Sequence, residues 1–114
     1  MVIHRGEIWW AELQEPSGSG PGYKRPLVII QSNEFNKSRI NTIVAVVLTT
    51  NIRLADSPGN VMLSKKMTGL PKDSVANVSQ VVTIDRYFLV DRSGSLPAGT
   101  MKLIDDGLRL VLSL

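Results

Sequence analysis

Two side chains of this chain could act on a phosphate group, and each stands where a strand is expected to begin or end. Arg25 precedes Pro26, and the proline ring holds Arg25 in an extended conformation because it clashes with a helical preceding residue. Thr49 ends a β-branched, apolar run that is typical of a buried strand. A guanidinium can bond two phosphate oxygens at once, and a hydroxyl can bond the same group. A solvated Lys24–Arg25 pair and a threonine favoured for its strand propensity would give the same pattern.

The segment that leads to Arg25 is rich in glycine. Residues 17–25 read SGSGPGYKR, so three glycines fall within five residues. Such a backbone can bend freely and approach a ligand closely. The spacing is not that of a Walker phosphate loop. The sequence therefore predicts either a plain surface loop or a phosphate-holding loop beside Arg25.

Few other side chains of this chain could take part in catalysis. The chain has no cysteine, its single histidine, His4, stands ahead of the first expected strand, and metal-ligand spacing is absent. The Asp105–Asp106 pair falls on the polar side of the expected C-terminal helix, where a solvated face is the simpler interpretation. RNA cleavage by the adjacent 2′-hydroxyl meets these limits, because the substrate supplies the nucleophile and the protein mainly aligns it and stabilises charge.

A glutamine interrupts the last long strand. Strict alternation would place Gln80 in one row with Ala76, Val78, Val82 and Ile84. A glutamine in an apolar row must find a hydrogen-bond partner or face a ligand. A solvent-facing Gln80 on a partly exposed strand is the alternative.

Charge is unevenly distributed along the chain. Between Lys24 and Lys72 there are eight basic residues and two acidic residues, whereas the formal charge of the whole chain is only +3. Neutralisation of phosphates drives the binding of nucleic acids, so a basic central block favours a polyanionic partner.

The elements that must position these residues are mostly short strands. A chain of 114 residues suits one domain, here residues 1–114, with a single core. No stretch has the length of a membrane span or the form of a signal peptide, and the absence of cysteine fits a cytoplasmic location. Turn signals separate strands expected at 6–13, 27–31, 41–50, 61–64, 74–84 and 89–93, with a helical turn in 32–39, a loop at 51–59, a turn-rich piece at 67–72 and a helix from 97 to 114.

The C-terminal helix carries two apolar stripes. Met101, Ile104, Leu108 and Val111 have the spacing of a core-facing stripe. A weaker second stripe either covers the sheet more widely or meets a second chain; it comprises Leu103, Gly107, Leu110 and Leu114. Strands followed by one such helix predict a small, mainly β barrel with a C-terminal α-helix.

The segments RGEIWWAEL, GSGPGYKRPLVIIQS, NTIVAVVLTTN, GNVMLS, TGLPKDSVANVSQ and GLRLVLSL occur in this order along essentially the whole chain. Together they resemble the MazF/PemK family of toxin endoribonucleases. The most specific parts are the glycine-rich loop that ends in Arg-Pro and the strand that ends in Leu-Thr-Thr-Asn.

The resemblance implies an SH3-like barrel, a homodimer, an antitoxin partner and cleavage of single-stranded RNA, without a cofactor or metal, to a 2′,3′-cyclic phosphate and a 5′-hydroxyl. It places the catalytic arginine at Arg25 and the catalytic threonine at Thr49. RNA contacts are expected at Gly22, Tyr23, Lys24, Asn51, Asn77 and Gln80. Many family members have an acidic residue where this chain has Gly20, which leaves the identity of the general base open.

Two other functions fit parts of this pattern. A related toxin type with the same barrel poisons DNA gyrase by binding alone, but the Arg25–Thr49 pair has no purpose there. A non-catalytic SH3-like binding module would use Trp9 or Trp10 as an aromatic platform, which leaves the basic block unexplained.

Overall fold

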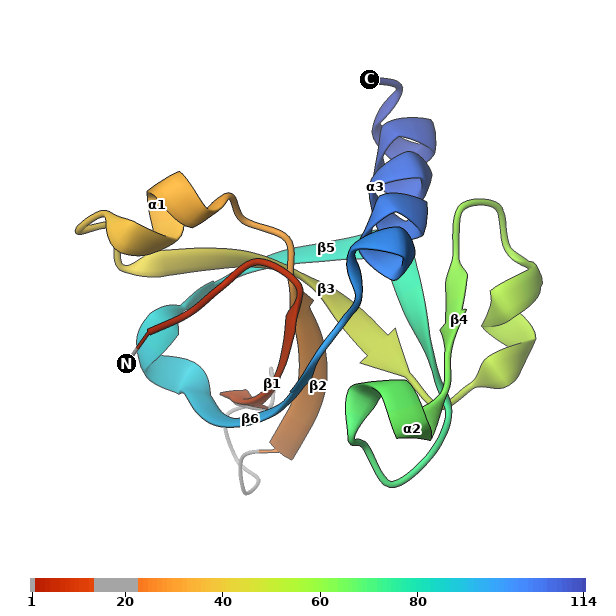
Figure 1. The fold of residues 1–114 in the computed structure, drawn as a ribbon, viewed down its shortest axis with the longest axis horizontal. Coiled ribbons are helices and arrows are strands. Elements are labelled where there is room, and N and C mark those ends of the chain that lie inside the picture. Colours follow the sequence, from red (N-terminus) through yellow and green to blue (C-terminus); the bar gives the residue numbers. More distant parts are fainter. Residues whose placement is uncertain (1, 14–22) are drawn as a thin grey trace.

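The computed structural model describes residues 2–13 and 23–114, which form one curled antiparallel sheet with a helix against it (Figure 1). The strand order in the sheet is β4-β5-β3-β2-β1-β6. This arrangement confirms the predicted mainly β fold with a C-terminal helix. The strands are β1 (Glu7–Leu13), β2 (Tyr23–Ile29), β3 (Thr42–Thr49), β4 (Val61–Leu63), β5 (Ser74–Asp85) and β6 (Leu89–Ser95).

Short helices connect the strands, and the one long helix ends the chain. Their bounds are α1 (Asn33–Lys37), η1 (Ile52–Asp56), α2 (Lys65–Thr68), η2 (Arg86–Phe88) and α3 (Ala98–Leu112), η1 and η2 being 3₁₀ helices. Three differences from the sequence prediction are the most marked. Strand β2 begins four residues earlier than expected, and the expected loop at 51–59 contains η1. Helix α2 begins before the expected turn because Ser64 caps it: the Ser64 hydroxyl accepts a hydrogen bond from the Met67 N–H at 3.2 Å. No helix of the described residues is long and apolar enough to cross a membrane.

The two faces of the sheet hold two separate apolar clusters, as the alternation of side chains along a strand requires. The cluster under α3 contains Ile8, Val28, Val46 and Leu48, all almost fully buried, together with residues of the helix. The cluster inside the curl contains Trp9, Ala11, Leu27, Ile29, Ile43, Ala45 and Val47. Trp9 is core, as predicted for one of the two tryptophans, and the half-buried Trp10 packs against the other cluster.

Strand β5 changes face in its middle. Its first half pairs Ala76 with Leu48, and its second half pairs Val81 with Val46, so four residues of β5 stand opposite Val47 alone. Such a bulge bends the strand and shifts its alternation. Ala76 and Val78 therefore join the cluster under α3, whereas Val82 packs inside the curl. The prediction of one continuous row through Gln80 is wrong for this reason.

Helix α3 lies against the sheet through part of its predicted stripe. Met101, Ile104 and Leu108 are buried as expected, but Val111 is 44% exposed because the helix extends past the edge of the sheet (Figure 1). Gly107 touches the turn before β4, and a Cβ at this position would overlap the carbonyl oxygen of Gly59. The second stripe stays largely uncovered in this single chain, with Leu103, Leu110 and Leu114 exposed.

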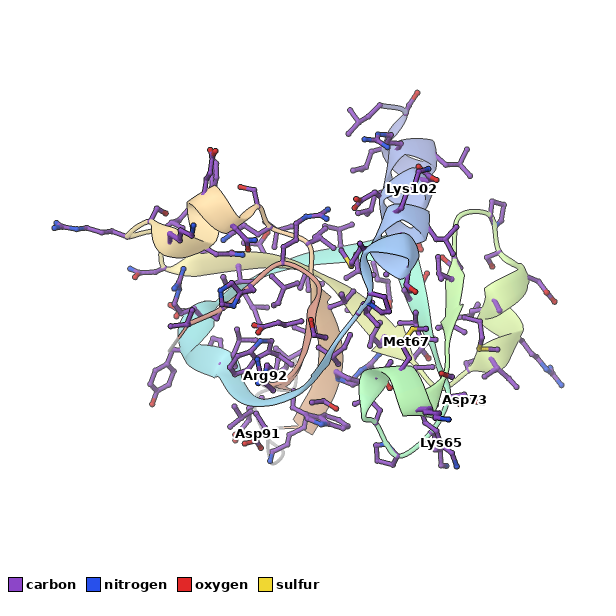
Figure 2. The ribbon with its side chains drawn as sticks, in the orientation of Figure 1. Lys65, Met67, Asp73, Asp91, Arg92 and Lys102 are labelled. Carbon is purple, nitrogen blue, oxygen red and sulfur yellow. The ribbon has the colours of Figure 1, made fainter. Side chains whose placement is uncertain are left out.

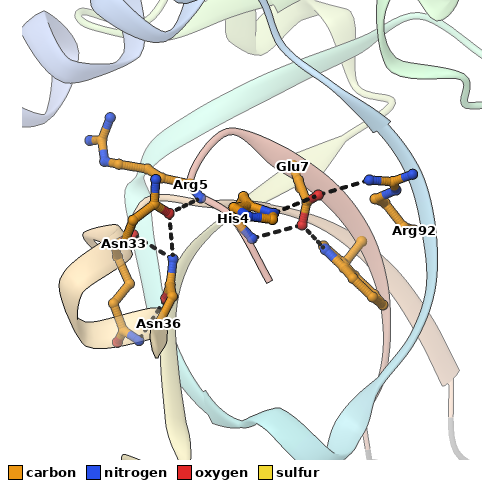
Figure 3. Close-up of polar contacts among 8 residues, drawn as sticks. His4, Arg5, Glu7, Asn33, Asn36 and Arg92 are labelled. Carbon is orange, nitrogen blue, oxygen red and sulfur yellow. Dashed lines mark hydrogen bonds and ion pairs between the residues drawn. The ribbon is translucent and has the colours of Figure 1, made fainter. Parts of the chain in front are cut away.

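A buried carboxylate ties β1 to β6. The side chain of Glu7 accepts hydrogen bonds from the backbone N–H of His4 at 2.8 Å, the indole of Trp9 at 3.0 Å and the guanidinium of Arg92 at 2.9 Å (Figure 3). Burial alone would raise the pKa of Glu7, but these hydrogen bonds and the charge of Arg92 outweigh burial and lower the pKa below its usual value of 4.5. Glu7 is therefore held as a fully satisfied anion.

A second polar anchor joins the N-terminal segment to α1 and α3. The guanidinium of Arg5 pairs with Asp105 and donates from Nε to the carbonyl of Ile30 at 2.8 Å. Its backbone N–H donates to the Asn33 side chain at 2.7 Å (Figure 3). Asp105 is consequently half-buried and structural, which corrects the expectation of a wholly solvated Asp105–Asp106 face; only Asp106 is exposed.

Candidate functional site

Arg25 and Thr49 lie at the same end of the sheet, on adjacent strands. The ladder between β2 and β3 includes the pair Leu27–Val47, and both of these side chains pack inside the curl. Arg25 precedes Leu27 by two residues and Thr49 follows Val47 by two. Both therefore belong to the same face of the sheet, because side chains two positions apart along a strand share a face.

The two strands are not paired at Arg25 and Thr49. The β2–β3 ladder stops at Leu27–Val47, and from there β2 continues along β1 while β3 continues along β5. Figure 1 shows the two strands diverging in this region. Neither side chain is buried, and the Thr49 hydroxyl oxygen accepts from the Asn51 N–H at 3.2 Å.

An open pocket of about 360 Å³ lies beside Arg25. Apolar residues form its floor, and the half-buried Arg25 and Tyr23 and the exposed Gln80 supply its polar groups. Thr49 is not among the residues that line it. The structure thus brings Arg25, Tyr23 and Gln80 together in one pocket, with Thr49 near its rim by register. The pocket residues are Leu13, Tyr23, Arg25, Val47, Gln80, Val81 and Val82.

The remaining predicted contacts differ in position. Lys24 is exposed next to Arg25, and Asn51 is exposed beyond the end of β3. Asn77 lies in the β5 bulge, where its side-chain oxygen accepts from the Ser79 hydroxyl at 3.0 Å. Gly22 and Gly20 lie outside the described residues.

Asn60 supports the site, but the sequence does not predict this role. Its side-chain oxygen accepts from the Val78 N–H at 3.0 Å, and its amide donates to the Leu54 carbonyl at 2.8 Å and the Asn77 oxygen at 3.4 Å. These bonds hold the bulge that presents Asn77 and Gln80. The Ser-Pro-Gly-Asn turn predicts Asn60 only as a turn residue, because its partner strand is far away in the sequence.

The positive charges at this end of the sheet form no ion pair with a described residue. Every ion pair among the described residues joins side chains from residues 4–7 or 92–109. None involves a described residue of the basic block from Lys24 to Lys72. Within residues 2–13 and 23–114 there is also no group of three histidine or acidic residues that could hold a metal ion. The site can therefore offer positive charge and hydrogen-bond donors to an anion.

Comparison with known proteins finds one toxin family and endoribonucleases that are similar to this chain over its whole length. The family described as PemK-like, MazF-like toxins of type II toxin–antitoxin systems matches residues 4–112. Endoribonuclease MazF6 of Mycobacterium tuberculosis (strain H37Rv) is 51% identical over all 114 residues of both chains. Endoribonuclease EndoA of Bacillus subtilis (strain 168) is 33% identical over 100% of this chain and 97% of its own.

Solved structures agree with the fold. An endoribonuclease from a mycobacterial species, in complex with its cognate antitoxin, superposes with a TM-score of 0.78 at 27% identity and covers 98% of this chain and 96% of its own. The MazE–MazF structure from Deinococcus radiodurans gives a TM-score of 0.82 at 18% identity over 100% of this chain and 98% of that chain, which speaks for the fold alone.

Proposed function

This chain belongs to the PemK-like, MazF-like toxins of type II toxin–antitoxin systems, an RNA-cleaving family, and we propose that it cuts single-stranded RNA with Arg25 and Thr49 as its catalytic residues. The observation that carries the assignment of residues is that Arg25, which forms no ion pair with a described residue, lies in an open pocket on the same face of the sheet as Thr49. Neither a metal nor a cofactor takes part in the proposed reaction.

The reaction uses the nucleophile of the substrate. The ribose 2′-oxygen attacks the adjacent phosphorus and loses its proton, while the bond from phosphorus to the 5′-oxygen breaks and that oxygen gains a proton. The products are a 2′,3′-cyclic phosphate and a 5′-hydroxyl. Arg25 stabilises the extra negative charge on the pentacoordinate phosphorus, because a guanidinium fits two phosphate oxygens. Thr49 hydrogen-bonds the same phosphate and fixes its orientation.

Substrate contacts outside the reacting phosphate come from neighbouring groups. Tyr23 and Gln80 line the pocket and suit an unpaired base, since single-stranded RNA presents its bases for stacking and for hydrogen bonds at their edges. Lys24 contributes charge, and Gly22, Asn51 and Asn77 are further contacts. Proton transfer is assigned to no residue, because the described lining of the pocket contains no acid and no histidine.

The proposal extends to the partners and the setting of the toxin. Its partners are an antitoxin protein, as in the mycobacterial complex, and a second copy of the chain, for which the exposed leucines of α3 offer an apolar surface. Residues 1–114 act as a single domain built on one sheet. The proposed location is the cytoplasm, where mRNA is available.

A cleavage assay tests the chemistry. The purified protein is incubated with mixed-sequence RNA in excess EDTA, the cut ends are sequenced, and a short RNA that contains the cut site is then synthesised with and without a 2′-deoxy substitution at that nucleotide. Cleavage should persist in EDTA, leave a cyclic phosphate and disappear with the deoxy substrate. A protein that still cuts the deoxy RNA, or cuts no RNA, would contradict the proposal.

A further inference from the structure

Four neighbouring strands bring several lysines to the end of the sheet that holds Arg25 and Thr49. Strands β4, β5, β3 and β2 are adjacent in this order and antiparallel, so the ends of β4 and β3 lie beside the starts of β5 and β2. In the β3–β5 ladder Val75 pairs with Thr49, and in the β4–β5 ladder Ser74 pairs with Leu63. Whatever follows Leu63 or precedes Ser74 therefore lies near Thr49.

Lysines occupy these positions. Lys65 and Lys66 begin α2 directly after β4, and Lys72 stands two residues before β5. All three side chains are exposed, and none forms an ion pair with a described residue. They lie at the same end of the sheet as Lys24 and Arg25 of β2 and add positive charge to that end.

Asp73 is an acidic residue among these lysines. Its carboxylate accepts from the backbone N–H of Lys65 at 2.8 Å, which ties the start of β5 to the start of α2. Figure 2 shows Lys65 and Asp73 next to each other below Met67. Asp73 thus fixes the position of α2 and neutralises only part of the charge around it.

Helix α2 is a rigid support for the lysines. Gly69 ends the helix in a left-handed conformation with φ of 77°, and a side chain there would overlap the carbonyl oxygen of Ser93 in β6. In the same contact, Gly94 lies against the carbonyl of Thr68, and the Ser93 hydroxyl donates to that carbonyl at 2.9 Å. The α2 backbone is therefore locked onto β6, and its lysines project from a fixed surface.

We propose that Lys65, Lys66 and Lys72 form a second phosphate-binding surface, which holds the RNA strand on one side of the cut site. Exposed cations that form no ion pair with a described residue, at the same end of the sheet as a phosphate-cleaving pocket, suit the backbone of a single strand, which carries one negative charge per nucleotide. These lysines bind RNA and take no part in the chemical step. The inference rests on the proposed function, whose pocket it extends.

The test compares a triple variant with a matched control. The variant carries Lys65→Gln, Lys66→Gln and Lys72→Gln. The control carries Lys37→Gln, Arg39→Gln and Lys102→Gln, which remove the same charge from α1, from the segment before β3 and from α3. Lys37 and Arg39 are exposed and precede Thr42, so they lie at the opposite end of β3.

Binding is measured by fluorescence anisotropy with the uncleavable RNA that has a 2′-deoxy nucleotide at the cut site, over a series of salt concentrations. Three lost phosphate contacts should make the slope of log affinity against log salt less steep by about 2 and weaken binding at least about tenfold at low salt. The control should keep the parental slope. The rate of cleavage at saturating RNA should stay within about twofold of the parent for the triple variant, because the loss concerns binding alone.

Lengthening the RNA on the 5′ or the 3′ side identifies the flank that is bound. One of the two extensions should strengthen binding to the parent protein and fail to do so with the triple variant. If the parent cuts RNA but the triple variant binds it with the slope of the control, the lysines serve another partner, such as an acidic protein segment, and the inference is overturned while the proposed function stands. A parent protein that neither binds nor cuts RNA overturns both.

Discussion

Two regions of this molecule use charge in opposite ways. At the junction of the N-terminal segment with β6 and α3, each charged group has a partner: Glu7 with Arg92, and Arg5 with Asp105. At the end of the sheet that holds Arg25 and Lys65, the cations have no acidic partner among the described residues. The first region stabilises the fold, and the second is free to bind an anion that the protein itself does not supply.

The difference follows from the effect of each arrangement on the free energy of folding. A buried carboxylate must be fully hydrogen-bonded, since an unpaired one destabilises the folded state by several kcal/mol. Exposed cations remain hydrated and cost little until a polyanion displaces their counterions. Substitutions in the paired region should therefore change stability, and substitutions at the strand ends should change activity.

Arg25→Ala should give the largest effect. Loss of the guanidinium should lower the cleavage rate at least about 100-fold, as expected when a group that stabilises transition-state charge is removed. The midpoint of urea unfolding should stay at the parental value, because the Arg25 side chain forms no ion pair with any residue that the structure describes. Single-turnover cleavage of the short RNA and urea titration measure the two quantities.

Arg92→Ala is the reciprocal control for this prediction. It should lower the free energy of unfolding by about 1–2 kcal/mol, because it leaves part of the Glu7 carboxylate without a donor, and it should retain the parental cleavage rate. An Arg25→Ala protein that cuts at the parental rate, or an Arg92→Ala protein that is folded but inactive, would break the division into two regions.

Gly107→Ala should destabilise the fold by about 2 kcal/mol. The added methyl group overlaps the backbone of Gly59, and overpacking of this kind exceeds the gain in helix propensity. Gly99→Ala is the matched control in the same helix, since a Cβ there meets nothing within 4 Å. Thermal unfolding of the two variants should differ clearly, and equal melting temperatures would show that the Gly59–Gly107 contact is not tight.

The effect of Glu7→Gln on stability should depend on pH. At pH 7 the amide places a donor opposite a donor of Arg92 and should cost about 1–2 kcal/mol. The lowered pKa of Glu7 means that the carboxylate adds stability above its unfolded pKa of about 4.5 and loses it as the pH falls through the folded pKa. The stability difference between parent and variant should therefore shrink below pH 4.5, as urea titrations over a series of pH values would measure.

Much of this architecture could be predicted from local sequence. The apolar runs give β1 and β3 almost to the residue, and the spacing of Met101, Ile104 and Leu108 gives the buried face of α3. Arg25 and Thr49 stand out as phosphate-binding types at strand ends. In each of these cases the pattern depends on neighbours within a few positions along the chain.

The errors come from contacts between distant parts of the chain. The bulge in β5 requires knowledge of the register with β3, so the position of Gln80 could not be predicted from alternation alone. The pairing of Asp105 with Arg5 joins residues that are 100 positions apart. Val111 is exposed because the sheet ends before the helix does, and the helical pattern holds no information on the length of the sheet.

The bulge in β5 also has an evolutionary consequence. Because it separates the strand into one half that packs under α3 and another that packs inside the curl, the two halves can accumulate substitutions under different constraints. Gln80, which lines the open pocket, can be substituted while Ala76 and Val78 continue to pack under the helix. One bend of one strand thus separates residues that line the open pocket from residues that form the core under the helix.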